Sequence, residues 1–84
     1  MSEHKIKVEV NLFANLRKYA PPESIEGSTT MELDEGITID ELCRLLEIPP
    51  SELKQFFVNH VRRGEDYRLQ EGDRVAIFPP VAGG

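Results

Sequence analysis

The chain has 84 residues, of which 39% are hydrophobic and 30% are charged, and its formal net charge is −5 at pH 7. This length allows one small domain, residues 1–84, and leaves no room for a second. The acidic excess argues against a nucleic-acid backbone as partner, since such binding depends on clustered Lys and Arg. No apolar run reaches the roughly 18 residues of a membrane span, and residues 1–5 lack the apolar core of a signal peptide. We therefore expect a cytoplasmic protein.

The first half of the chain reads as two strands. Residues 5–13 alternate between apolar and polar side chains, which is the period of a half-buried strand. Residues 14–20 allow a helical turn at most, because two prolines follow. Residues 29–33 carry β-branched side chains and precede an Asp-Glu-Gly cluster, so we predict a second strand there.

The best-determined element is a helix that begins after Thr38. Thr38 and Glu41 have the spacing of a capping box, and Ile37 and Leu42 have the spacing of a hydrophobic staple. The helix should end by about residue 47 or 48, ahead of a pair of prolines. Its apolar stripe requires a sheet to cover and consists of Ile39, Leu42, Cys43, Leu45 and Leu46.

The second half of the chain is again rich in strands. Residues 56–58 form a compact β-type run, and Asn59 and His60 occupy the position of a two-residue hairpin turn. A short strand or loop follows from residue 61, and residues 74–78 alternate as a last strand.

The order is therefore strand, strand, helix, strand, short strand, strand. We predict an α+β roll with a mixed sheet of four to five strands and one main helix across one face. The helix should cross over between the second and third strands, and the first and last strands, the most apolar ones, should lie centrally.

The last seven residues place a bare carboxylate on a stiff arm. Pro79 and Pro80 fix φ and lack backbone donors, so the chain must leave the sheet there. Gly83 and Gly84 have no Cβ and suit a channel too narrow for side chains. The terminal carboxylate is ionised at neutral pH and can attack the α-phosphate of a nucleotide to form a mixed anhydride. A merely frayed end is disfavoured because Gly-Gly directly follows Phe-Pro-Pro-Val-Ala.

Residues 71–84, EGDRVAIFPPVAGG, resemble the carboxy-terminal signature of the MoaD/ThiS sulfur carriers, the prokaryotic relatives of ubiquitin. The Phe-Pro-Pro-Val-x-Gly-Gly ending is most like that of molybdopterin synthase small subunits. This resemblance implies a β-grasp, ubiquitin-like fold with a flexible C-terminal tail at residues 79–84. It also implies a chain that carries sulfur and does not itself catalyse.

The resemblance further implies the chemistry and its partners. An E1-like adenylyltransferase of the MoeB/ThiF type would use ATP and Mg²⁺ to adenylate the Gly84 carboxylate, and persulfide-derived sulfur would displace AMP to leave a thiocarboxylate. The loaded tail would enter a MoaE-like large subunit of molybdopterin synthase, and the carrier itself would bind no cofactor or metal. The residues implied are Gly84 and Gly83 for chemistry and threading, Ala82 and Val81 as the inserted arm, and Pro80, Pro79 and Phe78 as its base.

Other destinations for the tail stay open. Carriers for thiamine synthesis or tRNA thiolation and ubiquitin-like protein modifiers also end in Gly-Gly, and a β-grasp interaction module with an incidental tail belongs to a different class. The residue after Asn59 is His60 and not the glycine common at that turn, which leaves the pathway open.

Two side chains have competing interpretations. Phe78 is an exposed docking residue if the helix covers the face of Val75 and Ile77, and a core residue if the faces are reversed. Cys43 invites a thiol role, but its place on the apolar stripe favours a buried small hydrophobe.

Overall fold

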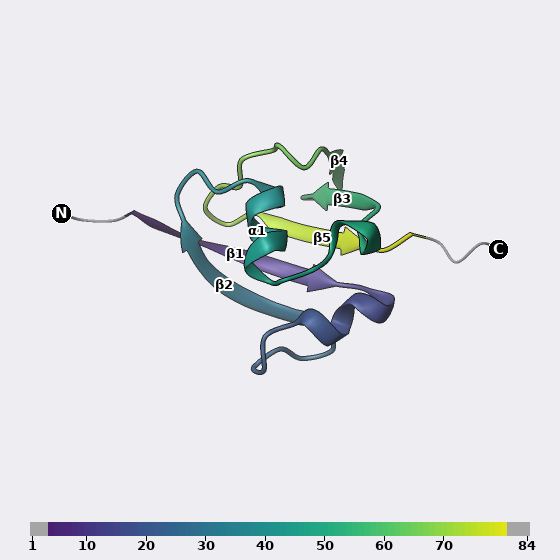
Figure 1. The fold of residues 1–84 in the computed structure, drawn as a ribbon. Coiled ribbons are helices and arrows are strands. Elements are labelled where there is room, and N and C mark those ends of the chain that lie inside the picture. The colour runs from purple at the N-terminus through teal and green to yellow at the C-terminus, as the bar shows by residue number, and fades with distance from the viewer. Residues whose placement is uncertain (1–3, 81–84) are drawn as a thin grey trace.

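The computed structural model describes residues 4–80 and shows one sheet crossed by one helix (Figure 1). The order of elements predicted from the sequence is confirmed, with two short 3-10 helices added. In chain order the elements are β1 (Lys5–Leu12), η1 (Ala14–Tyr19), β2 (Ser28–Asp34), α1 (Ile39–Leu45), η2 (Pro50–Glu52), β3 (Gln55–Val58), β4 (Val61–Arg63) and β5 (Arg74–Phe78).

The five strands form a mixed sheet in the order β2-β1-β5-β3-β4. β1 and β5 run parallel, and every other neighbouring pair is antiparallel. The first and last strands therefore lie centrally, as predicted. The connection that contains α1 leaves β2 at one edge and returns at β3, carrying the helix across one face of the sheet (Figure 1).

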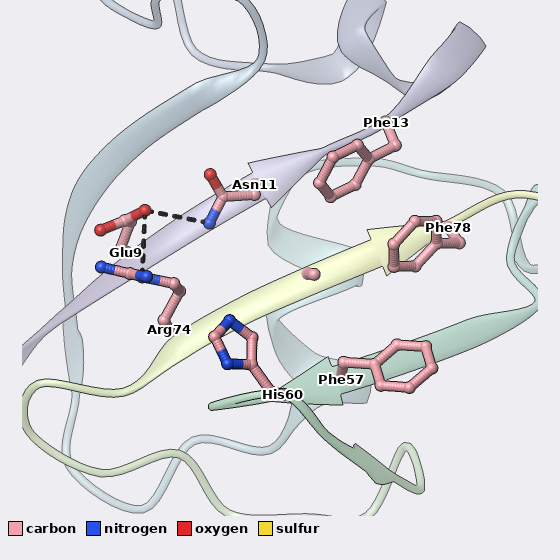
Figure 2. Close-up of a pocket in the computed structure, with 8 residues that line it drawn as sticks. Glu9, Asn11, Phe13, Phe57, His60, Arg74 and Phe78 are labelled. Carbon is pink, nitrogen blue, oxygen red and sulfur yellow. Dashed lines mark hydrogen bonds and ion pairs between the residues drawn. The ribbon is translucent and has the colours of Figure 1, made fainter.

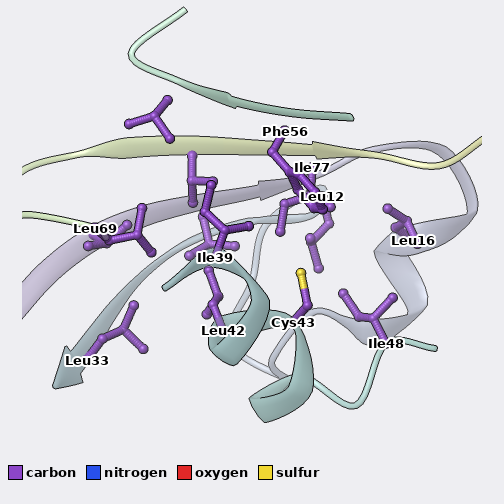
Figure 3. Close-up of a cluster of buried hydrophobic side chains, with 14 of the residues drawn as sticks. Leu12, Leu16, Leu33, Ile39, Leu42, Cys43, Ile48, Phe56, Leu69 and Ile77 are labelled. Carbon is purple, nitrogen blue, oxygen red and sulfur yellow. The ribbon is translucent and has the colours of Figure 1, made fainter. Parts of the chain in front are cut away.

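The core lies between that face and α1 (Figure 3). Alternate residues of β1 and β5 point into it, because successive side chains of a strand point to opposite faces. Val75 and Ile77 are fully buried there, beside Leu42 and Cys43 of the helix. The opposite face of the sheet, which we call the open face, is covered by no helix among residues 4–80 (Figure 1).

The helix begins as the sequence predicts. The Thr38 hydroxyl accepts a hydrogen bond from the Glu41 backbone N–H at 3.1 Å, and the Glu41 carboxylate accepts one from the Thr38 N–H at 2.9 Å. This reciprocal pair satisfies two backbone donors that the first turn leaves without helical partners.

The helix ends two or three residues earlier than predicted. Its last residue is Leu45, because Glu47 adopts a left-handed conformation with φ 62°. The Ile48 N–H then donates to the Cys43 carbonyl at 3.0 Å and the Glu47 N–H to the Arg44 carbonyl at 2.9 Å. This is a Schellman ending, and a glutamate in the position that usually holds glycine hides it from sequence reasoning.

The β3–β4 hairpin turns as predicted through Asn59 and His60, with φ values of 52° and 72°. The Asn59 side chain secures the turn: its Nδ2 donates to the carboxylate of Asp73 at 3.0 Å, and its Oδ1 accepts from the Arg74 N–H at 3.0 Å. The Asp73 carboxylate is buried and also accepts from the Gln70 N–H at 2.8 Å. The turn is thereby tied to the start of β5.

Substitutions at these two turn residues should have opposite effects. His60→Gly should raise the free energy of unfolding by about 0.5–1 kcal/mol. Glycine avoids the left-handed strain, and this gain exceeds the cost of the extra backbone entropy that glycine loses on folding. Asn59→Gly relieves the same strain but loses two side-chain hydrogen bonds, so it should lower stability by about 1 kcal/mol or more. Urea unfolding of both variants measures the difference, and shifts in the same direction would contradict this account of the turn.

Candidate functional site

The tail leaves the body at the end of the central strand. On one side of β5 the Phe13 N–H donates to the Ile77 carbonyl at 3.3 Å. On the other side the Lys54 N–H donates to the Phe78 carbonyl at 2.9 Å. Pro79 and Pro80 come next and have no N–H to continue either ladder, so the strand stops there. The root of the tail is thus held from both sides.

The structure brings three of the predicted site residues together at this root. Phe78 ends β5, Pro79 is half-buried against the body and Pro80 is exposed. The other four predicted residues lie outside the described part of the chain: Val81, Ala82, Gly83 and Gly84. Their roles as inserted arm and reactive terminus therefore stay predictions.

Phe78 lies on the open face, opposite the buried side chains of Val75 and Ile77 (Figure 2). Its ring stacks on Phe13 with centroids 4.5 Å apart and an interplanar angle of 1°, and it meets Phe57 edge-on at 5.6 Å. These three rings, which we call the aromatic patch, come from the residue that follows β1, from β3 and from β5. The helix covers the other face, so Phe78 lies outside the core, where it is half-buried. Its role in docking stays a prediction.

A hollow of about 470 Å³ runs along the open face from the aromatic patch. Ala76 also lines the hollow. The other end of the hollow is polar, with Glu9, Asn11, His60 and Arg74 (Figure 2). The Arg74 Nε lies 3.4 Å from the Glu9 carboxylate, which also accepts a hydrogen bond from Asn11 Nδ2 at 3.2 Å. An apolar end beside an ion pair is suited to contact with another protein, since protein interfaces combine aromatic anchors with a polar rim.

The sequence did not single out Phe13 and Phe57 as members of this surface. Part of the signal was present. By strand alternation, Phe13 and Phe57 each point to the face opposite the inward-facing apolar residues of their own segment. The register that brings them to Phe78 depends on pairing between strands distant in sequence.

Cys43 is 1% exposed, which confirms its role as a small core residue. Burial raises the pKa of its thiol to about 12, and the nearby carboxylates of Asp40 and Glu65 add to the shift. The thiol is therefore protonated and shielded at neutral pH, which is unsuited to nucleophilic chemistry.

Within residues 4–80, no group of three or more His, Cys, Asp or Glu is arranged to hold a metal ion. No helix in the same range is long and apolar enough to cross a membrane.

A five-stranded mixed sheet, one helix across it and an arm leaving the central strand define a ubiquitin-like β-grasp protein. The ThiS family model matches residues 10–84, and the chain belongs to the ThiS family. The resemblance to the MoaD/ThiS sulfur carriers is confirmed by this match.

Solved structures agree with this assignment. The HVO 2177 protein of Haloferax volcanii is 27% identical over 95% of this chain and 88% of its own, with a TM-score of 0.72. A putative molybdopterin converting factor, subunit 1, from Pyrococcus furiosus is 26% identical over 90% of this chain and 99% of its own, with a TM-score of 0.67. The small archaeal modifier protein 1 of Methanosarcina acetivorans shares the fold at 24% identity, covering 96% of this chain and 99% of its own, with a TM-score of 0.64. No curated protein matches the chain by sequence.

The stack between Phe13 and Phe78 should be measurable as a coupling energy. A double-mutant cycle of Phe13→Ala and Phe78→Ala should give about 0.5–1.5 kcal/mol in the free energy of unfolding, the usual value for an aromatic pair. Phe13→Ala combined with Leu45→Ala is the control, because Leu45 lies on the helix across the sheet, and this pair should be additive. Additivity of the Phe13 and Phe78 substitutions would contradict the stack.

The raised pKa of Cys43 should appear in the pH dependence of stability. The folded thiol keeps its proton to about pH 12, whereas an unfolded thiol releases it near 9.0. Above that lower value unfolding releases a proton, so the free energy of unfolding should fall with rising pH, by at most about 1.4 kcal/mol per pH unit. Cys43→Ala lacks this contribution, so the stability of the wild type relative to the variant should decline between about pH 8.5 and 10.5. A difference independent of pH would show that the thiol titrates normally.

Proposed function

We propose that this chain is a sulfur carrier that acts through the carboxylate of Gly84. An E1-like adenylyltransferase, with ATP and Mg²⁺, joins this carboxylate to AMP, and pyrophosphate leaves. The outer sulfur of a persulfide then displaces AMP to form an acyl disulfide. A second thiol attacks the other sulfur of that bond and leaves as a disulfide, so that the chain ends in a thiocarboxylate able to donate sulfur. The chain is in this account a substrate of the activating enzyme and carries no catalytic residue of its own.

The observation that carries this proposal is the exit of the tail. The last strand lies in the middle of the sheet, is held on both sides up to Phe78, and then passes through Pro79 and Pro80 towards a Gly-Gly end. The family match extends over the same residues to position 84. The buried, protonated thiol of Cys43 supports the same assignment, since it leaves sulfur chemistry to the terminus.

Within the family, we propose the small subunit of molybdopterin synthase. The Phe-Pro-Pro base at residues 78–80 favours it, as does the likeness to the Pyrococcus furiosus protein described as subunit 1 of a molybdopterin converting factor. Such a subunit requires a large partner subunit that receives the tail. The aromatic patch adjoins the root of the tail and would dock against that subunit or the activating enzyme.

A protein-modifier function is the second candidate, favoured by the shared fold with the small archaeal modifier protein 1. The two functions differ in where the activated terminus goes. A modifier would form an isopeptide bond with lysines of other proteins. Trypsin cuts after Arg74, so each modified lysine would carry residues 75–84 as its remnant.

The carrier function is tested by co-expressing the chain with an E1-like enzyme and a cysteine desulfurase. The intact mass should show one oxygen replaced by sulfur, and fragmentation should place it on Gly84. A chain with one serine added after Gly84 keeps the body but moves the carboxylate, and it should stay unmodified. An unchanged mass despite an activating enzyme that releases pyrophosphate would contradict the carrier function, and lysine adducts bearing residues 75–84 would favour the modifier.

A further inference from the structure

The outer edge of β2 has backbone groups that face away from the sheet. In an antiparallel pair, opposite residues alternate between bonded and non-bonded positions. The Leu12 N–H donates to the Gly27 carbonyl at 2.8 Å, and the Glu35 N–H donates to the His4 carbonyl at 3.0 Å, so the bonded positions of β2 are its odd-numbered residues. The even-numbered residues of β2 therefore direct their N–H and C=O groups outward.

Only some of these outward-facing backbone groups of β2 have hydrogen-bond partners. Ser28 exchanges both of its backbone hydrogen bonds with Ile25, and the Asp34 carbonyl accepts from Ile37 at 3.2 Å. The N–H and C=O of Thr30 and of Glu32, and the N–H of Asp34, have no partner among residues 4–80. Two full residues and part of a third thus form a template for an added strand.

A groove lies directly beside this template. It encloses about 320 Å³ between β2 and α1, and its apolar wall consists of Leu33, Ile37 and Leu45. Leu45 is 59% exposed although it lies on the helix that covers the core. An added strand would direct alternate side chains towards this wall, since side chains of a strand alternate between its faces.

The charge around the groove is negative. Glu32, Asp34 and Glu41 line it together with a single lysine, Lys5, which already forms an ion pair with Asp34. An incoming segment with Lys or Arg would therefore be attracted, and an acidic one repelled. The opposite edge of the sheet is shorter and basic, because β4 has only three residues and exposes Arg62 and Arg63.

We propose that the β2 edge and this groove bind an extended peptide segment of a partner protein in which apolar residues alternate with Lys or Arg. The backbone groups of Thr30 and Glu32 pair with the segment as an added strand. Its apolar side chains contact Ile37 and the exposed Leu45, and its basic side chains face Glu32. This surface is separate from the aromatic patch, so a segment can bind while the tail is engaged elsewhere.

The test uses a labelled synthetic heptapeptide, acetyl-Lys-Ile-Lys-Ile-Lys-Ile-Lys-amide, with the glutamate version as control. Fluorescence anisotropy measures the Kd, and amide hydrogen exchange by NMR reports on the N–H groups of Thr30 and Glu32. Both amides should exchange rapidly in the free protein and slow on addition of the basic peptide. The acidic peptide should bind at least about tenfold more weakly.

Three variants locate the binding. Thr30→Pro removes one outward N–H without breaking a bond to β1, as an edge strand tolerates, and should weaken binding about tenfold. Leu45→Ser removes the apolar wall and should weaken binding by a similar factor. Val61→Ser is the matched control, because Val61 is 49% exposed on the opposite edge, and it should leave the Kd unchanged.

Several results would overturn the proposal. These are no binding at about 1 mM peptide, equal binding of both peptides, and binding that leaves the exchange of Thr30 and Glu32 unchanged. The two amides could also exchange slowly without peptide, but only at high protein concentration. That result would show that the edge pairs with a second copy of the chain and not with a partner's segment. If Thr30→Pro does not fold, Leu45→Ser and Val61→Ser still decide the outcome.

Discussion

The parallel pairing of β1 with β5 is the constraint on which the rest of the structure depends. Parallel strands cannot be joined by a hairpin, so the chain between them must supply the crossover helix and the other strands. Because β1 and β5 run in the same direction, Phe13 and Phe78 emerge at the same end of the sheet and stack. The tail consequently leaves from the middle of the sheet, where neighbours on both sides fix its root.

The alternation of side chains along β5 divides its residues between the two faces of the sheet. Val75 and Ile77 face the helix and are fully buried, whereas Ala76 and Phe78 face the hollow on the open face. A single five-residue strand thus contributes to the core, lines the hollow on the open face and leads into the tail. In the proposed function, this body presents the terminus, and the carboxylate of Gly84 is the reactive group.

Local signals in the sequence predicted the elements, and the apolar content of the first and last strands predicted their central position. The register between strands distant in sequence was not predicted. The capping box at Thr38, the turn at Asn59 and the strand at residues 74–78 each depend on neighbours along the chain, and all three are confirmed. The aromatic patch and the unpaired edge of β2 depend on register and strand order, which alternation alone does not specify. The early end of α1 was missed for another reason, since Glu47 has a conformation that glycine usually signals.

The central claim is that the folded body is needed to present the terminal carboxylate for activation. The most direct measurement is ATP–pyrophosphate exchange by the E1-like enzyme, comparing the whole chain with a synthetic peptide of residues 78–84. Docking of the body should give the whole chain a kcat/KM at least about 100-fold higher, because binding energy remote from the reacting group contributes to catalysis. Equal activation of the free peptide would show that the body plays no part, and would contradict the account.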